Sequence, residues 1–293
     1  AYVELRTGGD DKQKLETILD AFDETKHVLD CKARLIVSLK RDAKDMDGNL
    51  QAVKNAVALK ERGVVAIDFC GPPGAAADAP QGSVRGRGYL WDYLFTDGFA
   101  AAVRDGQDAG LHFVPHFAEF PEEPDHEQIL DAKPARLGHA VCMSEATWLR
   151  VKREEIPIEC CLFSNLNTMR RHDALPPGDG HPASRHPFVK WFRERHPFAL
   201  CCDNVGLHET SLSEHYELAA TVVSSSPEER QVIAWKMAFN ATQHILAGED
   251  VKADLQERLR RHPWCLRATR LGGSIVPPQP KRRCLDEDND ITA

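Results

Sequence analysis

Residues 64–70 read Val-Val-Ala-Ile-Asp-Phe-Cys, a short run that is mostly apolar and rich in β-branched residues, as expected of a buried strand. Stretches with helical periodicity flank it at residues 49–62 and 90–109. A strand between two helices is the repeating unit of a parallel sheet that is covered by helices. These residues therefore predict an α/β protein.

The same alternation continues along most of the chain. Seven apolar runs predict strands, at residues 2–5, 34–39, 64–70, 111–117, 136–139, 158–162 and 199–202. Helix-period stretches lie at 12–29, 49–62, 90–109, 127–131, 144–153 and 187–196, and three more follow the last strand, at 211–223, 227–247 and 252–261. No glycine fingerprint of a dinucleotide-binding fold interrupts them, so we predict a TIM-type (β/α)8 barrel.

Such a barrel closes with eight strands, and the chain opens directly on a strand. We therefore expect that the first barrel strand is missing and that about seven strands are present. We expect residues 1–267 to form this barrel together with its C-terminal helices. Residues 268–293 are polar and proline-rich, which predicts a disordered tail.

The composition limits the possible partners. The formal net charge of the 293 residues is −8, which argues against nucleic acid or an anionic membrane surface as the main partner. No run of 18 or more apolar residues occurs, and no charged-then-apolar leader precedes the first strand. We expect a cytoplasmic monomer that acts on a small molecule.

Titratable side chains stand at the carboxyl ends of three predicted strands, which is where TIM barrels place their chemistry. His116 and Glu119 follow the fourth strand, His139 ends the fifth, and Asp203 and Asn204 follow the seventh. Each residue alone is more typical of a structural or capping role, but the combination favours a site. Imidazole and carboxylate groups from different strands suit a zinc ion that keeps one position open for water.

The first of these strand ends needs a turn. Positions i and i+3 of a strand face opposite ways, so His116 and Glu119 converge only if the chain turns after Phe117. Pro121 favours that turn. We therefore expect both side chains to face one site.

A resemblance rests on six motifs in chain order. They are Tyr2-Val3-Glu4-Leu5-Arg6, Ile67-Asp68-Phe69-Cys70-Gly71, His116-x-x-Glu119-x-Pro121, Arg136-x-Gly138-His139, Cys161-Leu162-x-Ser164-Asn165 and Cys202-Asp203-Asn204. In order and spacing the chain resembles the adenosine/AMP deaminase superfamily. Its runs at 116–121, 162–165 and 205–220 are most similar to the adenosine deaminase-like branch, which hydrolyses N6-methyl-AMP and related nucleotides.

The resemblance implies a role for each matched residue. His116 and Asp203 would be ligands of one zinc ion, and Asp203 would also steer the bound water. Glu119 would give a proton to purine N1, and His139 would hold and deprotonate the attacking water. Gly71 would let the purine approach the backbone closely, because it has no Cβ.

Asn204 departs from the family pattern, which usually has a second aspartate that contacts purine N7. An amide donates a hydrogen bond at any pH, so Asn204 could keep this contact. It could equally be an ordinary turn residue after Asp203.

A second departure concerns the metal. The resemblance places a His-x-His pair on the first barrel strand, and no His-x-His occurs in this sequence. His112 and His116 cannot replace it, because four strand residues separate them by about 13 Å. His181 and His186 lie in a predicted loop and are weak candidates. We therefore expect this chain by itself to hold zinc weakly and to be inactive.

The expected function is that of a zinc-dependent hydrolytic deaminase acting at C6 of purine nucleosides or nucleotides, with N6-methyl-AMP converted to IMP and methylamine. Adenosine deaminase proper is one alternative. A catalytically dead scaffold or binding protein of the same fold is another, and a phosphoesterase or amidohydrolase barrel is a third.

Three other features leave two interpretations open. Arg85-Gly86-Arg87-Gly88 could hold a phosphate or be a solvated insertion. Ser164-Asn165 could donate to a substrate or form a turn. The tryptophans at helix-like positions predict core residues, namely Trp91, Trp148, Trp191, Trp235 and Trp264.

Overall fold

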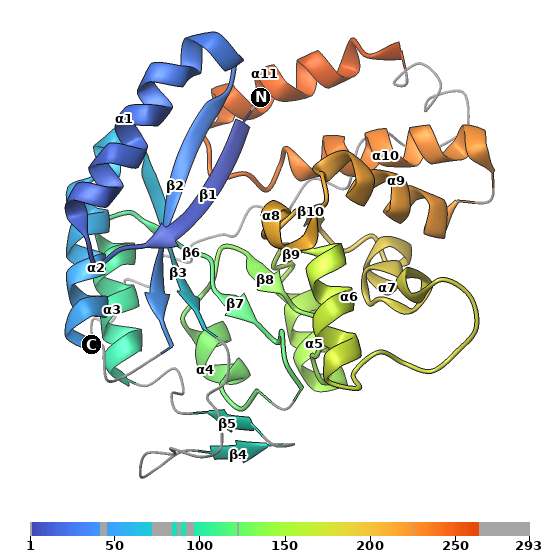
Figure 1. The fold of residues 1–293 in the computed structure, drawn as a ribbon, viewed down its shortest axis with the longest axis horizontal. Helices are drawn as coiled ribbons and strands as arrows, with labels where there is room; N and C mark the ends of the chain where they lie inside the picture. Colours follow the sequence, from blue (N-terminus) through green and yellow to red (C-terminus); the bar gives the residue numbers. More distant parts are fainter. Residues whose placement is uncertain are drawn as a thin grey trace, which may run out of the picture.

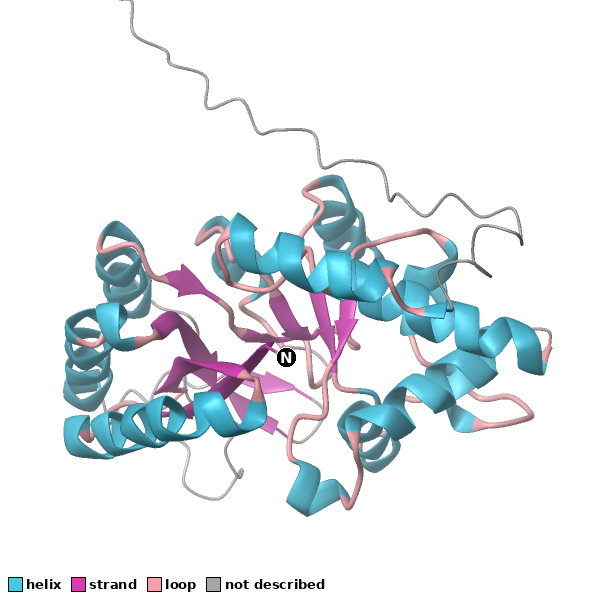
Figure 2. Ribbon diagram, turned by 90° about the horizontal axis from the view of Figure 1, so that it is seen from above, coloured by secondary structure: helices cyan, strands magenta, loops and turns pink. Residues whose placement is uncertain are grey.

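The protein is described by a computed structural model that covers residues 2–41, 46–71, 84–86, 89–91, 97–121, 123–224 and 226–263. The predicted tail at 268–293 lies outside these residues. Strands occupy the centre and helices surround them, as Figures 1 and 2 show. None of the helices in the described part of the chain is long and apolar enough to cross a membrane.

Parallel strands follow one another across the molecule in chain order. They are β1 (Tyr2–Gly8), β2 (Lys32–Lys40), β3 (Val64–Cys70), β6 (His112–Phe113), β7 (His116–Phe117), β8 (Leu137–His139), β9 (Ile158–Cys160) and β10 (Phe198–Leu200). β6 and β7 are two halves of the predicted strand at 111–117. The seven predicted strand positions are therefore confirmed.

The break between β6 and β7 falls at residues 114–115, where Pro115 cannot donate a backbone hydrogen bond. The sheet still continues through it. Val114 N donates to Ile67 O of β3 at 2.9 Å, and Gly138 N of β8 donates to Pro115 O at 2.8 Å. The two hydrogen-bonded sets β1-β2-β3-β6 and β7-β8-β9-β10 are therefore one run of strands.

Side chains that cross the interior show that this run curls toward a barrel. Arg6 on β1 bonds Glu159 on β9, with Nη2 and Oε2 2.5 Å apart. Arg136, just before β8, pairs with Glu4 on β1. In the sheet order these residues lie near opposite ends, so they can meet only if the sheet curves back on itself.

Helices cover the outside of the strands. The first half of the chain contributes α1 (Lys12–Leu29), α2 (Met46–Ala58), the 3₁₀ turn η2 (Lys60–Arg62), α3 (Asp97–Asp108) and α4 (His126–Asp131). The second half contributes α5 (Glu145–Arg153), α6 (Leu162–Arg171), the 3₁₀ turn η4 (Pro182–Arg185), α7 (Phe188–Arg193), α8 (Val205–His208), α9 (Leu212–Val223), α10 (Pro227–Ala241) and α11 (Glu249–Arg260). The main core lies between strands and helices, and Leu35, Val37 and Leu39 on alternate positions of β2 belong to it.

Several predicted elements differ from the structure. The helix predicted at 90–109 is shorter, because β5 (Tyr89–Trp91) pairs with β4 (Val84–Gly86) as a hairpin and α3 begins only at Asp97. α10 ends at Ala241, whereas the predicted helix ran to residue 247. The strand predicted at 158–162 ends at Cys160, because α6 begins at Leu162. Trp148, Trp191 and Trp235 are buried as predicted, while the side chains of Trp91 and Trp264 lie outside the described residues.

Candidate active site

The chain turns sharply after β7, as the convergence of His116 and Glu119 requires. Ala118 has a positive φ of 45°, so the backbone leaves the extended conformation of the strand there. The carboxylate of Glu123, which is buried, accepts hydrogen bonds from the backbone N–H groups of residues 118, 119 and 120 at 2.8, 3.1 and 3.1 Å. One side chain therefore fixes the loop that carries Glu119.

His116 is held by a carboxylate on the neighbouring strand. Its Nδ1 lies 2.9 Å from Oδ1 of Asp68, which is fully buried on β3. Arg6 and Ser38 also contact Asp68, through Nε at 3.3 Å and Oγ at 2.9 Å from its Oδ2. Burial raises the pKa of Asp68, but the charges of His116 and Arg6 outweigh this effect and hold the pKa below its ordinary value. Asp68 is therefore a carboxylate that orients the His116 ring.

His139 lies at the centre of the cluster. Its Nε2 is 3.7 Å from Oε2 of Glu119, and its ring centroid is 4.9 Å from that of His116. On its other side, Nδ2 of Asn165 lies 2.9 Å from Nδ1 of His139. Burial lowers the pKa of His139, and the nearby Glu119 carboxylate opposes this only in part. The ring is therefore neutral near pH 7 and can accept a proton.

Asp203 joins this cluster from the end of β10. One ligand atom each of His139, Cys161 and Asp203 lies within 4.8 Å of the others. Asp203 has a positive φ of 58°, so the chain turns as it leaves the strand. The strand ends of β8, β9 and β10 thus supply an imidazole, a thiol and a carboxylate at one place.

Asn204 forms the cap of a helix. Its Oδ1 accepts a hydrogen bond from Leu207 N at 2.9 Å and so caps α8. Its side chain is exposed. This geometry favours the turn-type interpretation, and a contact of the amide nitrogen with purine N7 stays a prediction.

The remaining predicted site residues differ in their surroundings. Gly71 has a φ of +145°, and a Cβ there would come 3.1 Å from Cβ of Arg41, so the position requires glycine. His181 and His186 accept hydrogen bonds from the backbone N–H groups two residues further on, at 3.1 and 3.0 Å. Both therefore have local roles. The side chains of residues 85–88 lie outside the described part of the chain, so their phosphate contact stays a prediction.

Sequence reasoning missed three of the groups that position the cluster. Asp68 was part of a quoted motif without a role, Glu159 was not noticed, and Asn165 was expected in a turn or against a substrate. Asn165 instead lies in the first turn of α6, where its amide contacts His139. The alternation of Glu4 and Arg6 on β1 was the available signal, since charges on one face of a barrel strand need partners inside the barrel.

A layer of charges supports the site from within the barrel. Glu159 bonds Arg6 and also Arg136, whose Nε lies 2.8 Å from Oε1 of Glu159. Burial raises the pKa of Glu159, but the two guanidinium groups outweigh it and lower the pKa to about 2. The layer therefore keeps Arg6, a partner of Asp68, in place.

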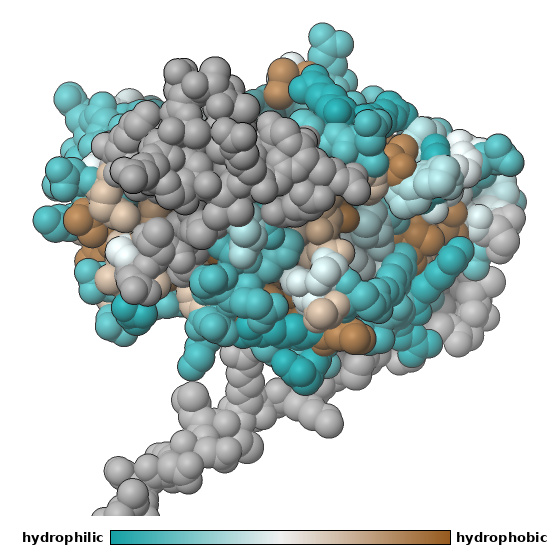
Figure 3. Space-filling view, turned by 90° about the horizontal axis from the view of Figure 1, so that it is seen from below, coloured by the Kyte–Doolittle hydropathy of each residue, from teal (hydrophilic) through white to brown (hydrophobic). Residues whose placement is uncertain are grey.

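The coloured part of the surface at the carboxyl ends of the strands is mostly polar. Figure 3 looks at the molecule from this side, and hydrophilic residues predominate among those that it colours. Hydrophobic residues occur there in small separate groups. Such a face suits a polar small molecule better than an apolar partner.

Comparison with known proteins identifies the family of the chain. The adenosine deaminase family model matches residues 6–262. The chain belongs to the adenosine deaminase family. It is 29% identical over 246 residues to N6-mAMP deaminase of Arabidopsis thaliana, a match that covers 84% of this chain and 59% of that relative. The crystal structure of the Arabidopsis N6-mAMP deaminase superposes with a TM-score of 0.70 at 25% identity, covering 89% of this chain and 73% of that one.

A second solved structure is that of Arabidopsis ADAL complexed with IMP. It has a TM-score of 0.70 and 25% identity and covers 88% of this chain and 71% of the other. The predicted TIM-type barrel is therefore confirmed as the fold of the family. The present chain spans 59% of the length of the Arabidopsis N6-mAMP deaminase.

Proposed function

We propose that the cluster at the carboxyl ends of the strands is the active site of a hydrolytic deaminase that acts at C6 of a purine nucleotide, with N6-methyl-AMP as the preferred substrate. The observation that carries the proposal is the environment of His139. A neutral imidazole faces the Glu119 carboxyl at 3.7 Å and lies within 4.8 Å of Asp203. A base, an acid and a metal-type ligand thus surround one small volume.

The residues present fit zinc in kind. Zinc binds imidazole, thiolate and carboxylate groups. His116 has its Nδ1 on the buried Asp68 carboxylate, as metal-bound imidazoles commonly do, which leaves Nε2 as the ligand atom. Asp203, next to Cys161, would supply the carboxylate. We propose His116 and Asp203 as the ligands, although His116 groups with Asp68 and Cys70, and Asp203 with His139 and Cys161. The two fall short of the ligands that a tightly bound zinc needs.

When bound, zinc would lower the pKa of a water molecule toward neutrality. The chain's own groups would do the rest. Glu119 would donate a proton to purine N1, so that the ring can accept addition at C6. Its carboxylate is half enclosed, with its side chain 18% exposed. Thr168 Oγ1, 3.5 Å from Oε1 of Glu119, would help to orient it.

His139 would take the proton of the attacking water. For this its Nε2, which faces Glu119, must carry the lone pair, and Nδ1 must carry the ring's proton. A half-turn of the Asn165 amide presents Oδ1 to Nδ1 and stabilises that tautomer. Oδ1 of Asn165 is buried and has no hydrogen-bond partner among the described residues, which agrees with such an exchange of roles. The amine would leave from C6 with the proton that His139 took from the water. Glu119 would take the proton of the new C6 hydroxyl, so that the purine gains a carbonyl oxygen and both residues return to their starting states.

The class of substrate rests on the relatives. Several similar proteins carry the name N6-methyl-AMP deaminase, among them those of Bos taurus and Danio rerio, at 26% and 28% identity. The Arabidopsis structure with IMP has a purine nucleotide bound. A nucleotide that bears an N6-alkyl group is therefore the first substrate to test.

The test is an assay of N6-methyl-AMP turnover by the longest natural form of the chain. We expect methylamine release, and we expect Glu119→Gln to lower kcat by about 10²-fold or more because a general acid is lost. Glu217→Gln, an exposed glutamate on α9, is the matched control and should leave kcat unchanged. Turnover that survives in Glu119→Gln would contradict the assignment.

A binding protein of the same fold is the second candidate, because the described residues bring fewer zinc ligands together at one place than a tightly bound ion needs. The two candidates differ in one outcome. A protein that binds N6-methyl-AMP or IMP in its longest natural form, but releases no amine with zinc added, is a binding protein. Hydrolysis of phosphoesters in place of N6-methyl-AMP would instead favour another barrel hydrolase.

A further inference from the structure

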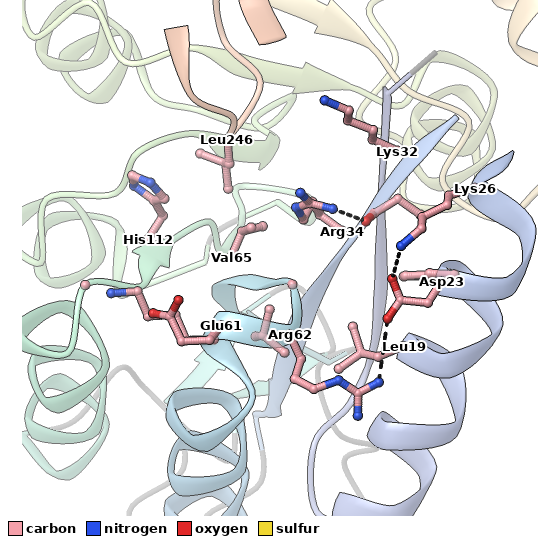
Figure 4. A pocket seen from close by; sticks show the side chains of 16 residues that line it. Leu19, Asp23, Lys26, Lys32, Arg34, Glu61, Arg62, Val65, His112 and Leu246 are labelled. Atoms are coloured by element: carbon pink, nitrogen blue, oxygen red, sulfur yellow. Dashed lines mark hydrogen bonds and ion pairs between the residues drawn. The ribbon is translucent and has the colours of Figure 1, made fainter. Parts of the chain in front are cut away.

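A cavity of about 580 Å³ lies at the amino-terminal ends of the strands, away from the histidine cluster at their carboxyl ends (Figure 4). It lies where β2, β3 and β6 begin, and α1 and η2 close its sides. Its volume is in the range of small-molecule sites. Phe22, Val65 and Leu246 supply apolar surface within it.

The lining of this cavity is basic although the protein is acidic. Five cationic side chains line it, namely Lys26, Lys32, Arg34, Lys60 and Arg62. Two carboxylates, Asp23 and Glu61, oppose them, which leaves three positive charges in a chain whose net charge is −8. His112 adds none near pH 7, because burial lowers its pKa below the ordinary value.

Two of the five cations, Lys26 and Arg62, form ion pairs with aspartates of α1. Asp23 pairs with Lys26 at 3.1 Å, and Arg62 lies 2.6 Å from Asp20 and 3.9 Å from Asp23. These ion pairs run along one wall of the cavity in Figure 4. The other carboxylate of the lining is Glu61 of η2.

Of the other three cations, Lys60 and Arg34 donate hydrogen bonds to neutral backbone oxygens, and Arg34 is also close enough to Asp23 to help Lys26 lower the pKa of that carboxyl. Lys60 Nζ donates to Ala109 O at 3.0 Å, and Arg34 Nη1 donates to Ala33 O at 2.8 Å. In the part of the chain that the structure describes, neither these two nor Lys32 forms an ion pair. Three like charges that share a cavity repel one another, so an anion between them would stabilise the protein.

We propose that this cavity binds a small organic phosphate, at a site separate from the proposed active site. Lys32, Arg34 and Lys60 come from two elements and offer both geometries that phosphate oxygens accept. The planar guanidinium can donate two parallel hydrogen bonds, and each ammonium acts as a point charge. The carbon skeleton of the ligand packs against Phe22 and Leu246.

The first experiment titrates pyrophosphate into the protein at constant ionic strength and measures heat of binding. We expect saturable binding that weakens as salt is added. Lys32→Gln and Arg34→Gln should each weaken it about tenfold, as expected for the loss of one charge-assisted hydrogen bond. Lys32 is exposed and Arg34 half-buried at the start of β2, and circular dichroism checks that the variants fold.

The matched control is Lys54→Gln. Lys54 is exposed on α2 and does not line the cavity, so the variant changes the net charge equally and should bind pyrophosphate as the parent does. His139→Ala, at the other end of the strands, should also leave the affinity unchanged. A nucleoside diphosphate that binds more tightly than pyrophosphate would identify the organic phosphate as a nucleotide, whereas equal affinity would contradict the packing of a carbon skeleton against Phe22 and Leu246.

Three results would overturn the proposal. One is no heat with either probe at millimolar concentration. Another is an equal loss of affinity in Lys54→Gln and Lys32→Gln, which would show an unspecific charge effect. The third is tighter binding of citrate than of pyrophosphate, which would show that the cavity prefers carboxylates.

Discussion

The contact between Asn165 and His139 decides which nitrogen of the imidazole can act as a base. Asn165 is fully buried, and its amide nitrogen lies 2.9 Å from Nδ1 of His139. We predict that Asn165→Leu lowers kcat for N6-methyl-AMP about 10- to 100-fold, because the ring loses the group that orients it and sets its tautomer. KM should change little, since the substrate does not depend on this amide for binding.

The pH dependence of kcat separates this positioning role from a structural one. In Asn165→Leu the acidic limb of the profile should move, because it reports the pKa of His139. Asn167→Leu is the control on the same helix. Its amide reaches His208 Nδ1 at 3.2 Å on the surface, and both kcat and the pH profile should stay as in the parent. A drop of kcat without any shift of the profile would argue against the assignment of His139 as the base.

The lowered pKa of Glu159 makes the stability of the fold depend on pH. Its pKa is lowered from the ordinary 4.5 to about 2, chiefly because Arg6 and Arg136 outweigh the effect of burial. A carboxyl with a lower pKa in the folded state stabilises folding above its unfolded pKa, and the contribution disappears as the pH falls. We therefore predict that stability falls between about pH 4.5 and pH 2 as this carboxylate is protonated.

Glu159→Gln tests this prediction. At pH 7 it should lower the free energy of unfolding by about 3–5 kcal/mol, because Arg6 and Arg136 each lose one of the two carboxylates that balance their charge. The loss of stability on acidification should also become shallower. Glu145→Gln breaks an exposed pair with Lys190 and should change stability by less than about 1 kcal/mol. Urea unfolding at several pH values measures both, and an unchanged acid limb in Glu159→Gln would exclude this residue as its source.

At the scale of single elements, α9 begins with a complete capping box. Ser211 Oγ accepts a hydrogen bond from Glu214 N, and the Glu214 carboxylate accepts one from Ser211 N at 2.6 Å. We predict that Ser211→Ala destabilises the protein by about 1 kcal/mol. Ser213→Ala, an exposed serine within the same helix, should cost nothing measurable. Thermal unfolding of the two variants makes the comparison, and equal midpoints would show that the cap does not limit stability.

Elements with strong periodicity were predictable from sequence, and elements set by single residues were not. The seven strand positions follow from short apolar runs, and the turn after β7 follows from Pro121. The break at Pro115 was missed because the apolar pattern continues across it. α6 was missed because the same apolar run that forms β9 continues through residue 162, so no change of period marks where the helix begins.

In the site, too, some features could be predicted from the sequence pattern and others could not. Strand ends in chain order place His116, His139 and Asp203 on one face of the molecule, because parallel strands share their carboxyl edge. The pairing of His116 with Asp68 depends on the register between two strands 48 residues apart, which a single sequence does not reveal. Asn165 reaches His139 only because α6 starts immediately after β9.

For the whole molecule, a charged layer joins β1 to β8 and β9 inside the barrel, beside a small apolar cluster that includes Ile36, Ala66 and Val114. It ties the first strand to the far side of the sheet without a backbone hydrogen bond between β1 and β10 in the described residues. The interior therefore depends on ion pairs that acid or the loss of one member would disrupt.

Metal content is the property of the whole chain that tests the proposed function most directly. His116 and Asp203 are the predicted ligands, and residues 1–293 contain no His-x-His pair to complete the set. We predict that purified 1–293 keeps well under one zinc per chain after dialysis, and that a natural form with a His-x-His strand keeps about one. Removing the metal from that longer form with a chelator should abolish amine release and lower its unfolding temperature, because a ligand that binds only the folded state stabilises it.

His116→Ala is the control that distinguishes zinc bound at the site from zinc bound to surface carboxylates. It removes the imidazole that lies 2.9 Å from Asp68 and leaves the exposed acidic residues unchanged. Elemental analysis should then find less zinc in the variant than in the parent of the same length. If residues 1–293 by themselves hold a full equivalent of zinc, and His116→Ala does not reduce it, the metal lies elsewhere. The group formed by His139, Cys161 and Asp203 would be the next to mutate, because it offers three zinc-type atoms without His116.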